Sequence, residues 1–299
     1  MERVDAILAG VNKAGTTSLY VSLAEHPAVD ASVIKETRYF LPARYGQALK
    51  PVSVWDGYFS HADRLVRLEA TPSYFYGGAA VAHAIRSTVP NPKIVLVLRE
   101  PVDRALSFFE YQKVRLRIPR DLTLDDYLAR VDALKDRDFG DPANEKYMGI
   151  RGGRYADWLG EWWDVLGHDA VKVVYFEDLT SRSADVLADV SDFLGLDPVE
   201  PGAAGLRTEN RTTSFKFARF QAVALRTNDG LERLLRRVPS VKRRLRSMYF
   251  AINGRPLGEL DVSDELRADL QARYAEPNRH LGDLLDSAGL TRPSWLSSE

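Results

Sequence analysis

Short apolar, β-branched segments alternate along this chain with segments that have the apolar spacing of a helix. The apolar segments span residues 4–8, 93–98 and 171–176, with a weaker one at 65–68. The helical patterns span residues 16–24, 79–89, 102–113, 155–166 and 183–194. Strands that are apolar throughout and alternate with helices are typical of a parallel sheet covered on both faces. The sequence therefore predicts the α/β class.

The last third of the chain has a different pattern. Residues 219–252 indicate a helix and a basic loop, and residues 263–287 indicate one amphipathic helix or two. We find no internal repeat, low-complexity tract or Pro/Gly-rich linker that would mark a second domain. We therefore expect one domain over residues 1–299, with an α/β core at 1–200 and an irregular helical cap at 201–299.

Composition excludes several classes of protein. The 299 residues include no cysteine, which rules out disulfides, thiolate metal sites and cysteine nucleophiles. A net charge of −1 argues against a dedicated nucleic-acid binder. No segment approaches the roughly 18 apolar residues of a membrane-spanning helix, and no export signal is visible. We expect a soluble, cytoplasmic protein, and the excess of arginine over lysine suggests a GC-rich bacterial gene.

The first apolar segment leads into a loop that contains two glycines. Gly10 and Gly15 let the backbone turn tightly between strand and helix, so that N–H groups and the helix dipole face an anion. The spacing matches the nucleoside-triphosphate loop G-x4-G-K-[ST], but Thr16 stands where that loop has its lysine, and Lys13 lies inside the loop. The loop predicts a phosphate site, with an ordinary polar turn as the alternative. Its candidate ligands are Lys13, Ala14, Gly15, Thr16, Thr17 and Ser18.

A second anion-binding pattern follows the apolar segment at 93–98. That segment ends in Arg99, where a nucleoside triphosphatase typically has an aspartate directed toward magnesium. Ser107 comes one turn into the next predicted helix, and the pair suits a second phosphate held without a metal. The alternative, a surface ion pair between Arg99 and Glu100, contributes little energy and does not account for Ser107.

Together these loops resemble the sulfotransferase family that uses 3′-phosphoadenosine 5′-phosphosulfate (PAPS). Three more segments fit the branch of heparan-type enzymes and their bacterial relatives: KETRYF at 35–40, EATPSYF at 69–75 and VYFEDL at 174–179. The resemblance covers residues 4–196 in register and implies a P-loop-like fold. It also implies PAPS as donor and 3′,5′-adenosine bisphosphate (PAP) as product. In this resemblance the first loop holds the 5′-phosphosulfate, and the 3′-phosphate site consists of Arg99, Ser107 and a late loop of Asn210, Arg211 and Thr212.

The resemblance also implies a general base, because the acceptor loses a proton as it attacks. Glu36 holds the base position, and Lys35 beside it would keep it charged or touch the donor. Lys13 is placed to meet the charge that grows on the bridging oxygen. His61 and Glu69 are the reserve candidates for the base. On charge pattern alone, residues 35–38 would be a solvated turn.

The acceptor stays open at the level of sequence. Ala70 stands where many glycan-modifying members have lysine, and Arg38 where they often have histidine. The acceptor is therefore a hydroxyl or amine of a glycan, lipid or small molecule. The five histidines show no paired ligand spacing, so we expect no metal. The alternatives are a P-loop nucleotide or small-molecule kinase and a non-catalytic phosphonucleotide-binding protein.

Residues 233–246, here called the basic segment, contain seven cations and no acid, interleaved with apolar side chains. Such a concentration of arginine creates a positive field, and its apolar interleaving suits docking on the domain or on an anionic membrane surface. We hypothesise that it borders the acceptor entrance and recruits an anionic or membrane-borne acceptor. The alternative is a solvated helix face.

Overall fold

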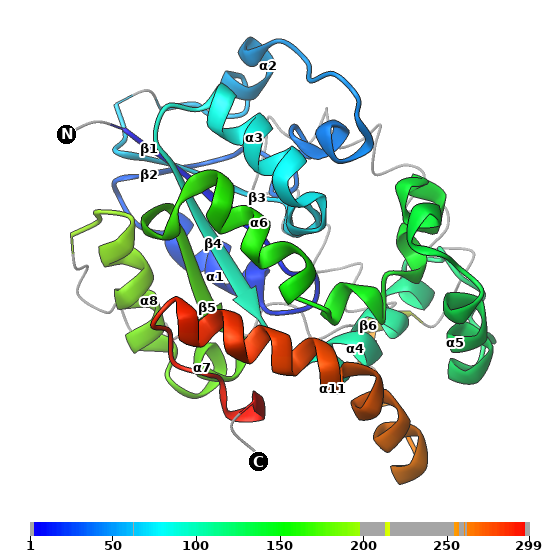
Figure 1. Ribbon diagram of the computed structural model, residues 1–299. Helices are drawn as coiled ribbons and strands as arrows, with labels where there is room; N and C mark the ends of the chain where they lie inside the picture. The colour runs from blue at the N-terminus through cyan, green and yellow to red at the C-terminus, as the bar shows by residue number, and fades with distance from the viewer. Residues whose placement is uncertain are drawn as a thin grey trace.

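The computed structural model describes residues 3–61, 63–197, 213–215, 254–256, 260 and 262–296. At its centre is a five-stranded sheet in the order β2-β3-β1-β4-β5, in which all neighbouring strands run parallel (Figure 1). The strands are β1 (Val4–Gly10), β2 (Val29–Ala31), β3 (Val66–Ala70), β4 (Pro92–Leu98) and β5 (Val171–Tyr175). The predicted α/β class with a central parallel sheet is confirmed.

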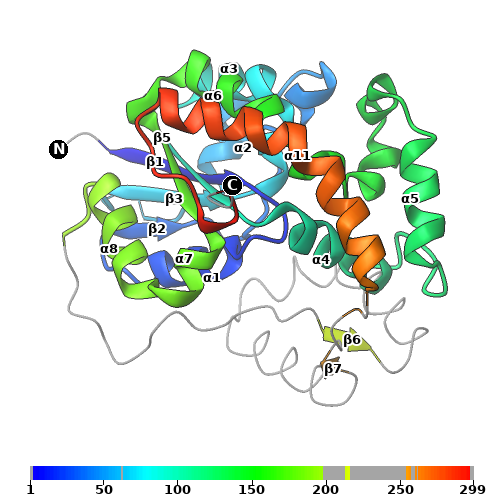
Figure 2. The same ribbon diagram turned by 60° about the horizontal axis from the view of Figure 1, so that its bottom comes forward.

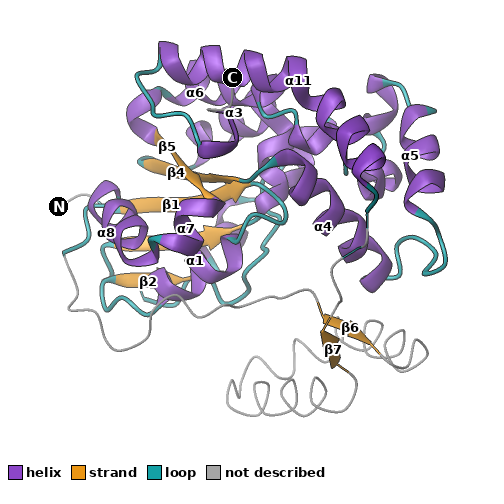
Figure 3. Ribbon diagram, turned by 90° about the horizontal axis from the view of Figure 1, so that it is seen from below, coloured by secondary structure: helices purple, strands orange, loops and turns teal. Residues whose placement is uncertain are grey.

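Helices cover both faces of this sheet, which explains why most residues of its strands are apolar and buried. Figures 2 and 3 show α3 (Gly78–Thr88), α6 (Ala156–Leu166) and α11 (Asp264–Ser287) on one face. On the other face lie α1 (Thr16–Ala24), α7 (Phe176–Ser181) and α8 (Ser183–Phe193). The helices α4 (Pro101–Val114) and α5 (Leu124–Asp132) lie beyond the carboxyl end of β4, and the short α2 (Val52–Asp56) precedes β3 in the chain.

Local signals determine where the helices begin. Glu100 accepts hydrogen bonds from the backbone N–H groups of the first turn of α4, and Pro101 occupies the first helical position. Thr123 and Ser263 cap α5 and α11 through their hydroxyls. By contrast, α1 begins at a left-handed Gly15 with no side-chain cap. The N–H groups of its first turn are therefore not satisfied by a capping side chain.

The strand β3 shows why its sequence pattern is weak. All five of its residues are buried, although two of them are charged. Arg67 donates hydrogen bonds to Asp5 at 2.5 Å and to Asp56 at 2.7 Å, which pairs a charge that would otherwise be costly to bury. The weak strand predicted at 65–68 is confirmed with shifted ends, whereas β2, α5 and α7 were not predicted.

The structure describes the C-terminal cap in part. The amphipathic pattern at 263–287 forms the single helix α11, which continues past Pro277 and contacts α6 and α4. Strand β6 (Thr213–Phe215) pairs antiparallel with β7 (Gly254–Pro256). All of residues 219–252, including the basic segment, lie outside the described residues, so the role of that segment stays a prediction. No helix in the described ranges is long and apolar enough to cross a membrane.

Candidate functional site

The two anion-binding patterns meet at the carboxyl edge of the sheet. Strands β1 and β4 are neighbours, so the loop after β1 and the arginine after β4 lie side by side. The backbone N–H of Val11 donates to the carbonyl of Val97 at 3.0 Å, and Arg99 Nη1 donates to the carbonyl of Lys13 at 3.2 Å. The carboxyl ends of parallel strands are where open α/β sheets bind ligands.

The backbone of the first loop is shaped for close approach. Lys13 and Gly15 both have left-handed conformations, with φ of 73° and 81°. A Cβ on Gly15 would lie 3.0 Å from the ring of Phe176 and 3.1 Å from a methyl of Leu179, so both this crowding and the positive φ disfavour a side chain there. With the start of α1 uncapped by a side chain, this loop fits a phosphate group.

The side chain of Lys13 is partly buried and lies near other cations. Its Nζ lies 4.8 Å from the centroid of the Tyr111 ring. Burial, followed by the charges of Arg99 and Lys35, lowers the pKa of Lys13 to about 8. An anion bound among these cations would relieve both the burial cost and the repulsion. The electrostatics of the loop therefore also fit a phosphate or sulfate ligand.

Arg99 makes two further contacts besides its hydrogen bond to the Lys13 carbonyl. Its guanidinium lies 4.5 Å from the centroid of the Phe176 ring, and its own carbonyl accepts a hydrogen bond from the Tyr155 hydroxyl at 2.6 Å. Burial lowers the pKa of Arg99. Glu100 caps α4 instead of pairing with Arg99, and within the described ranges Arg99 forms no ion pair. The alternative of a surface pair between Arg99 and Glu100 is therefore wrong.

Ser107 lies on the side of α4 that faces the first loop. Tyr111 follows it by four residues, so the two side chains share one helix face. Because the Tyr111 ring contacts Lys13, that face is directed at the loop. Tyr111 was not singled out from the sequence, although its four-residue spacing from Ser107 was a signal that could have identified it.

The segment with the expected base lies near this loop. Glu36 is 41% exposed, and its carboxylate lies 3.7 Å from Lys35 Nζ and 3.5 Å from Arg38 Nη2. Burial lowers the pKa of Lys35, and the charge of Lys35 in turn acts on Lys13. The structure therefore gathers Lys13, Lys35 and Glu36, with the one carboxylate among them accessible to an acceptor.

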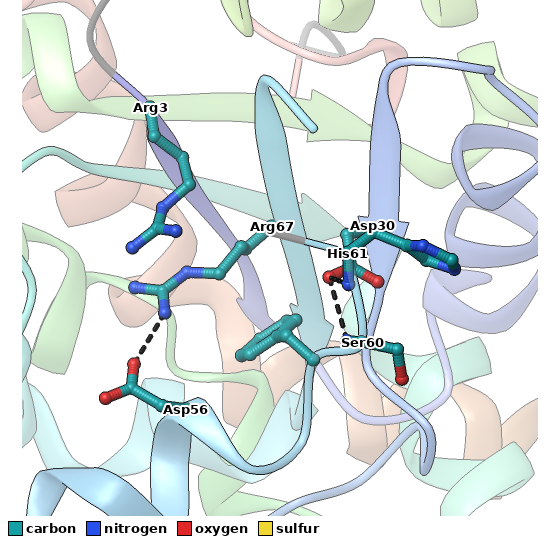
Figure 4. Close-up of a pocket in the computed structure, with 7 residues that line it drawn as sticks. Arg3, Asp30, Asp56, Ser60, His61 and Arg67 are labelled. Atoms are coloured by element: carbon teal, nitrogen blue, oxygen red, sulfur yellow. Dashed lines mark hydrogen bonds and ion pairs between the residues drawn. The ribbon is translucent and has the colours of Figure 1, made fainter. Parts of the chain in front are cut away.

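His61 lies elsewhere. Figure 4 shows it in a pocket of about 300 Å³ whose other lining residues include Arg3, Asp30 and Arg67. Arg3 precedes β1 and Arg67 is near the start of β3, so this pocket is at the amino edge of the sheet. His61 belongs to the connection that leads into β3 and must lie at that edge. This placement corrects the expectation of His61 as a reserve base.

Glu69, the other reserve base, lies at the carboxyl edge of the sheet, as the donor loop does, but it has no exposed surface. Burial raises the pKa of Glu69 to about 7, although hydrogen bonds from Thr71 and Thr37 oppose this shift. An acceptor outside the protein cannot reach this carboxyl group. The structure therefore corrects the expectation of Glu69 as a base.

The last two expectations concern the late loop and metal binding. Asn210, Arg211 and Thr212, the expected late loop, lie outside the described residues. Within the described ranges, no group of three or more histidine, aspartate or glutamate side chains is arranged to hold a metal ion.

Comparisons with known sequences agree on one type of domain. Residues 3–228 match the sequence model of the sulfotransferase domain. Heparan sulfate glucosamine 3-O-sulfotransferase 6 of Mus musculus is 30% identical over 192 residues, covering 64% of this chain and 52% of that protein. The human 3-O-sulfotransferase 3B1 is 31% identical over 196 residues, covering 64% and 46%. The chain thus spans about half the length of these curated relatives.

Two further comparisons extend over almost the whole chain. Bifunctional heparan sulfate N-deacetylase/N-sulfotransferase 1 of Caenorhabditis briggsae is 25% identical, covering 98% of this chain and 31% of that protein. A sulfotransferase crystal structure from Alicyclobacillus acidocaldarius superposes with a TM-score of 0.66 at 21% identity, covering 99% of each chain. This superposition shows that the two chains share one fold.

Proposed function

This chain belongs to the sulfotransferase domain family, and we propose that it moves a sulfuryl group from PAPS to an acceptor hydroxyl or amine, releasing PAP. One observation carries the proposal: Lys13, Arg99 and the accessible Glu36 converge at the carboxyl edge of the sheet, beside an α1 start without a side-chain cap. The acceptor belongs to a glycan, lipid or small molecule. Because the curated relatives are named for heparan sulfate, a glycan is the first acceptor to assay.

The donor's two phosphate ends would be held by different segments. The backbone N–H groups of residues 14–18, with the hydroxyls of Thr17 and Ser18, suit the 5′-phosphate. Arg99 and Ser107 suit the 3′-phosphate, since Phe176 and the carbonyl of Lys13 already orient the guanidinium. Both groups of ligands come from the ends of neighbouring strands, so their separation is set by the sheet.

When bound, PAPS supplies an activated sulfur with a phosphate leaving group. Glu36 takes the acceptor's proton as the new bond to sulfur forms. Lys13 stabilises the negative charge that develops on the oxygen between sulfur and phosphorus as the bond from sulfur to this oxygen breaks. Lys35 and Arg38 flank the carboxylate of Glu36, and their positive charges favour its ionised form. Catalysis thus depends on positioning and charge more than on covalent participation of the protein.

A thermal-shift comparison tests the proposal against its alternatives. We expect PAP without magnesium to raise the melting temperature, because a ligand at 100 times its Kd adds about 2.7 kcal/mol to the free energy of unfolding. Stabilisation by magnesium-ATP and not by PAP would support the kinase instead. Stabilisation by PAP with no transfer of labelled sulfate to any acceptor in a broad panel would support a non-catalytic binding protein.

Arg99→Ala is expected to weaken PAP binding roughly 10- to 100-fold, because it removes hydrogen bonds of a charged donor to the 3′-phosphate. Binding of adenosine 5′-phosphosulfate, which lacks that phosphate, should change little. Calorimetric titration of both nucleotides measures the difference. Arg86→Ala, at an arginine of α3 that bonds the Val165 carbonyl, is the matched control. Equal losses for the two nucleotides would remove Arg99 from the 3′-phosphate site.

A further inference from the structure

Glu69 is a buried ionisable side chain for which the proposed mechanism has no use. It lies at the carboxyl end of β3 and is 0% exposed. Its Oε1 accepts three hydrogen bonds: from the Thr37 backbone N–H at 3.1 Å, from Thr37 Oγ1 at 3.0 Å and from Thr71 Oγ1 at 2.5 Å. Its Oε2 is buried and has no hydrogen-bond partner in the described part of the chain. A carboxyl group is costly to bury in this way, so its contacts deserve a functional explanation.

The contacts of Glu69 extend into the segment that follows Glu36. Thr71 Oγ1 donates a hydrogen bond to Glu69 and accepts one from the backbone N–H of Arg38 at 3.2 Å. The Tyr74 hydroxyl lies 3.3 Å from Thr37 Oγ1 and accepts a hydrogen bond from the backbone N–H of Phe40 at 3.2 Å. Backbone N–H groups at three of the four positions from 37 to 40 are therefore held by side chains of β3 and of the turn after it.

This network also holds an unusual backbone conformation. Arg38 has a φ of 56°, in the left-handed region that non-glycine residues rarely occupy. Such a conformation persists only where the surroundings hold it. The hydrogen bond from Arg38 N–H to Thr71 is one direct restraint on it. The chain is therefore held in a specific path immediately after Glu36.

The side-chain contacts of Glu36 itself are weaker. Its two ion pairs, at 3.7 Å and 3.5 Å, involve a half-exposed carboxylate, and exposed pairs of this kind contribute little energy. The location of Glu36 is therefore set by the backbone that carries it more than by its own partners. Glu69 and Thr37 are the buried groups that attach this backbone to the sheet.

We propose that Glu69 is a positioning residue, which fixes the path of residues 37–40 through Thr37 and Thr71 and so places the Glu36 carboxylate beside the donor loop. This inference rests on the proposed role of Glu36 as the base. It assigns Glu69 no contact with donor or acceptor. Its effect on the reaction acts through the position of Glu36 alone.

A double-mutant cycle tests the inference. Glu69→Gln retains an oxygen that can accept all three hydrogen bonds, so it should keep most of the turnover. Glu69→Leu removes the acceptor and should lower kcat by up to about 100-fold, the loss expected for a misplaced catalytic group, with PAP affinity unchanged. In a Glu36→Gln background, Glu69→Leu should cause little further loss, because the group that it positions is already inactive.

Thr37→Val provides a second route if Glu69→Leu does not fold. It keeps the backbone N–H and the side-chain shape but removes the hydroxyl that bonds Glu69, so kcat should fall with unchanged PAP affinity. Tyr39→Phe is the matched control, since it removes a hydrogen bond of the same segment to the Lys50 carbonyl, away from Glu69. Turnover of Tyr39→Phe should equal that of the native protein.

The outcomes separate this inference from the function on which it rests. If Glu36→Gln alone retains native turnover, the base assignment and the inference both fail. If Glu36→Gln is impaired and adding Glu69→Leu to that variant lowers kcat as much again as it does in the native protein, Glu36 remains the base and the positioning role of Glu69 is wrong. Damage by Glu69→Gln as large as that by Glu69→Leu would also contradict the inference, because it would indicate a need for the ionised carboxyl group itself.

Discussion

Replacing Lys13 with alanine is expected to lower turnover by about 10²- to 10³-fold, the usual effect of removing one group that stabilises developing charge. The affinity for PAP should fall much less. The reason is that the charge on the bridging oxygen is fully developed only in the transition state, so Lys13 contributes most of its energy there. Turnover at saturating PAPS and calorimetric titration with PAP separate the two effects.

The lowered pKa of Lys13 gives an independent readout. In the free protein burial and two neighbouring cations hold this pKa at about 8, below its ordinary value of 10.5. A bound phosphate opposes both effects and raises the pKa again, so PAP binding between those two pH values should take up a proton. Calorimetry in buffers of different ionisation enthalpy measures this uptake, and Lys13→Ala should abolish it.

The matched control is Lys93→Ala. Lys93 lies at the start of β4, at the opposite edge of the sheet, where its Nζ donates to the carbonyl of Asp169. This variant should keep native turnover and native proton uptake. If Lys13→Ala instead weakens donor binding and leaves turnover at saturation unchanged, Lys13 is an anchor for the donor and has no role in charge stabilisation.

Glu36→Gln is expected to lower turnover by about 10²- to 10⁴-fold, the contribution assigned to general-base catalysis. The amide has nearly the same shape as the carboxylate but cannot take the acceptor's proton. Melting temperature and PAP affinity should be retained, because the half-exposed side chain makes no close contact with the donor loop's backbone in the described structure. Initial rates with saturating donor and acceptor measure the loss.

An exposed glutamate at the end of α1 offers the control for this variant. Glu25→Gln removes one carboxylate charge from the same protein without touching the site, and it should leave turnover unchanged. Near-native activity of Glu36→Gln would refute the assignment of Glu36 as the base. Such a result would leave the donor site unaffected, since the roles of Lys13 and Arg99 are tested by separate variants.

The features that sequence alone determined are those with a local cause. Residues 16–24 were predicted as a helix and form α1 with those bounds, because apolar spacing and the glycine turn before it act over a few residues. Arg99 was expected at the end of a strand, and the capping pattern of Glu100 and Pro101 places it there. A parallel sheet then puts this strand end at the same edge as the first loop, whereas their direct contact depends on the strand order, in which β4 lies beside β1.

Only the tertiary structure decided the environment of the charged groups. In sequence, Arg67 lies within the weak strand predicted at 65–68 and Glu69 directly follows it. Both are buried in the structure, where they bond partners distant in the chain such as Asp5 and Thr37. The same holds for His61, whose residue type suits a base but which lies in the connection before β3, at the opposite edge of the sheet. Burial and pairing depend on contacts between segments far apart in the chain, and local patterns contain no record of those contacts.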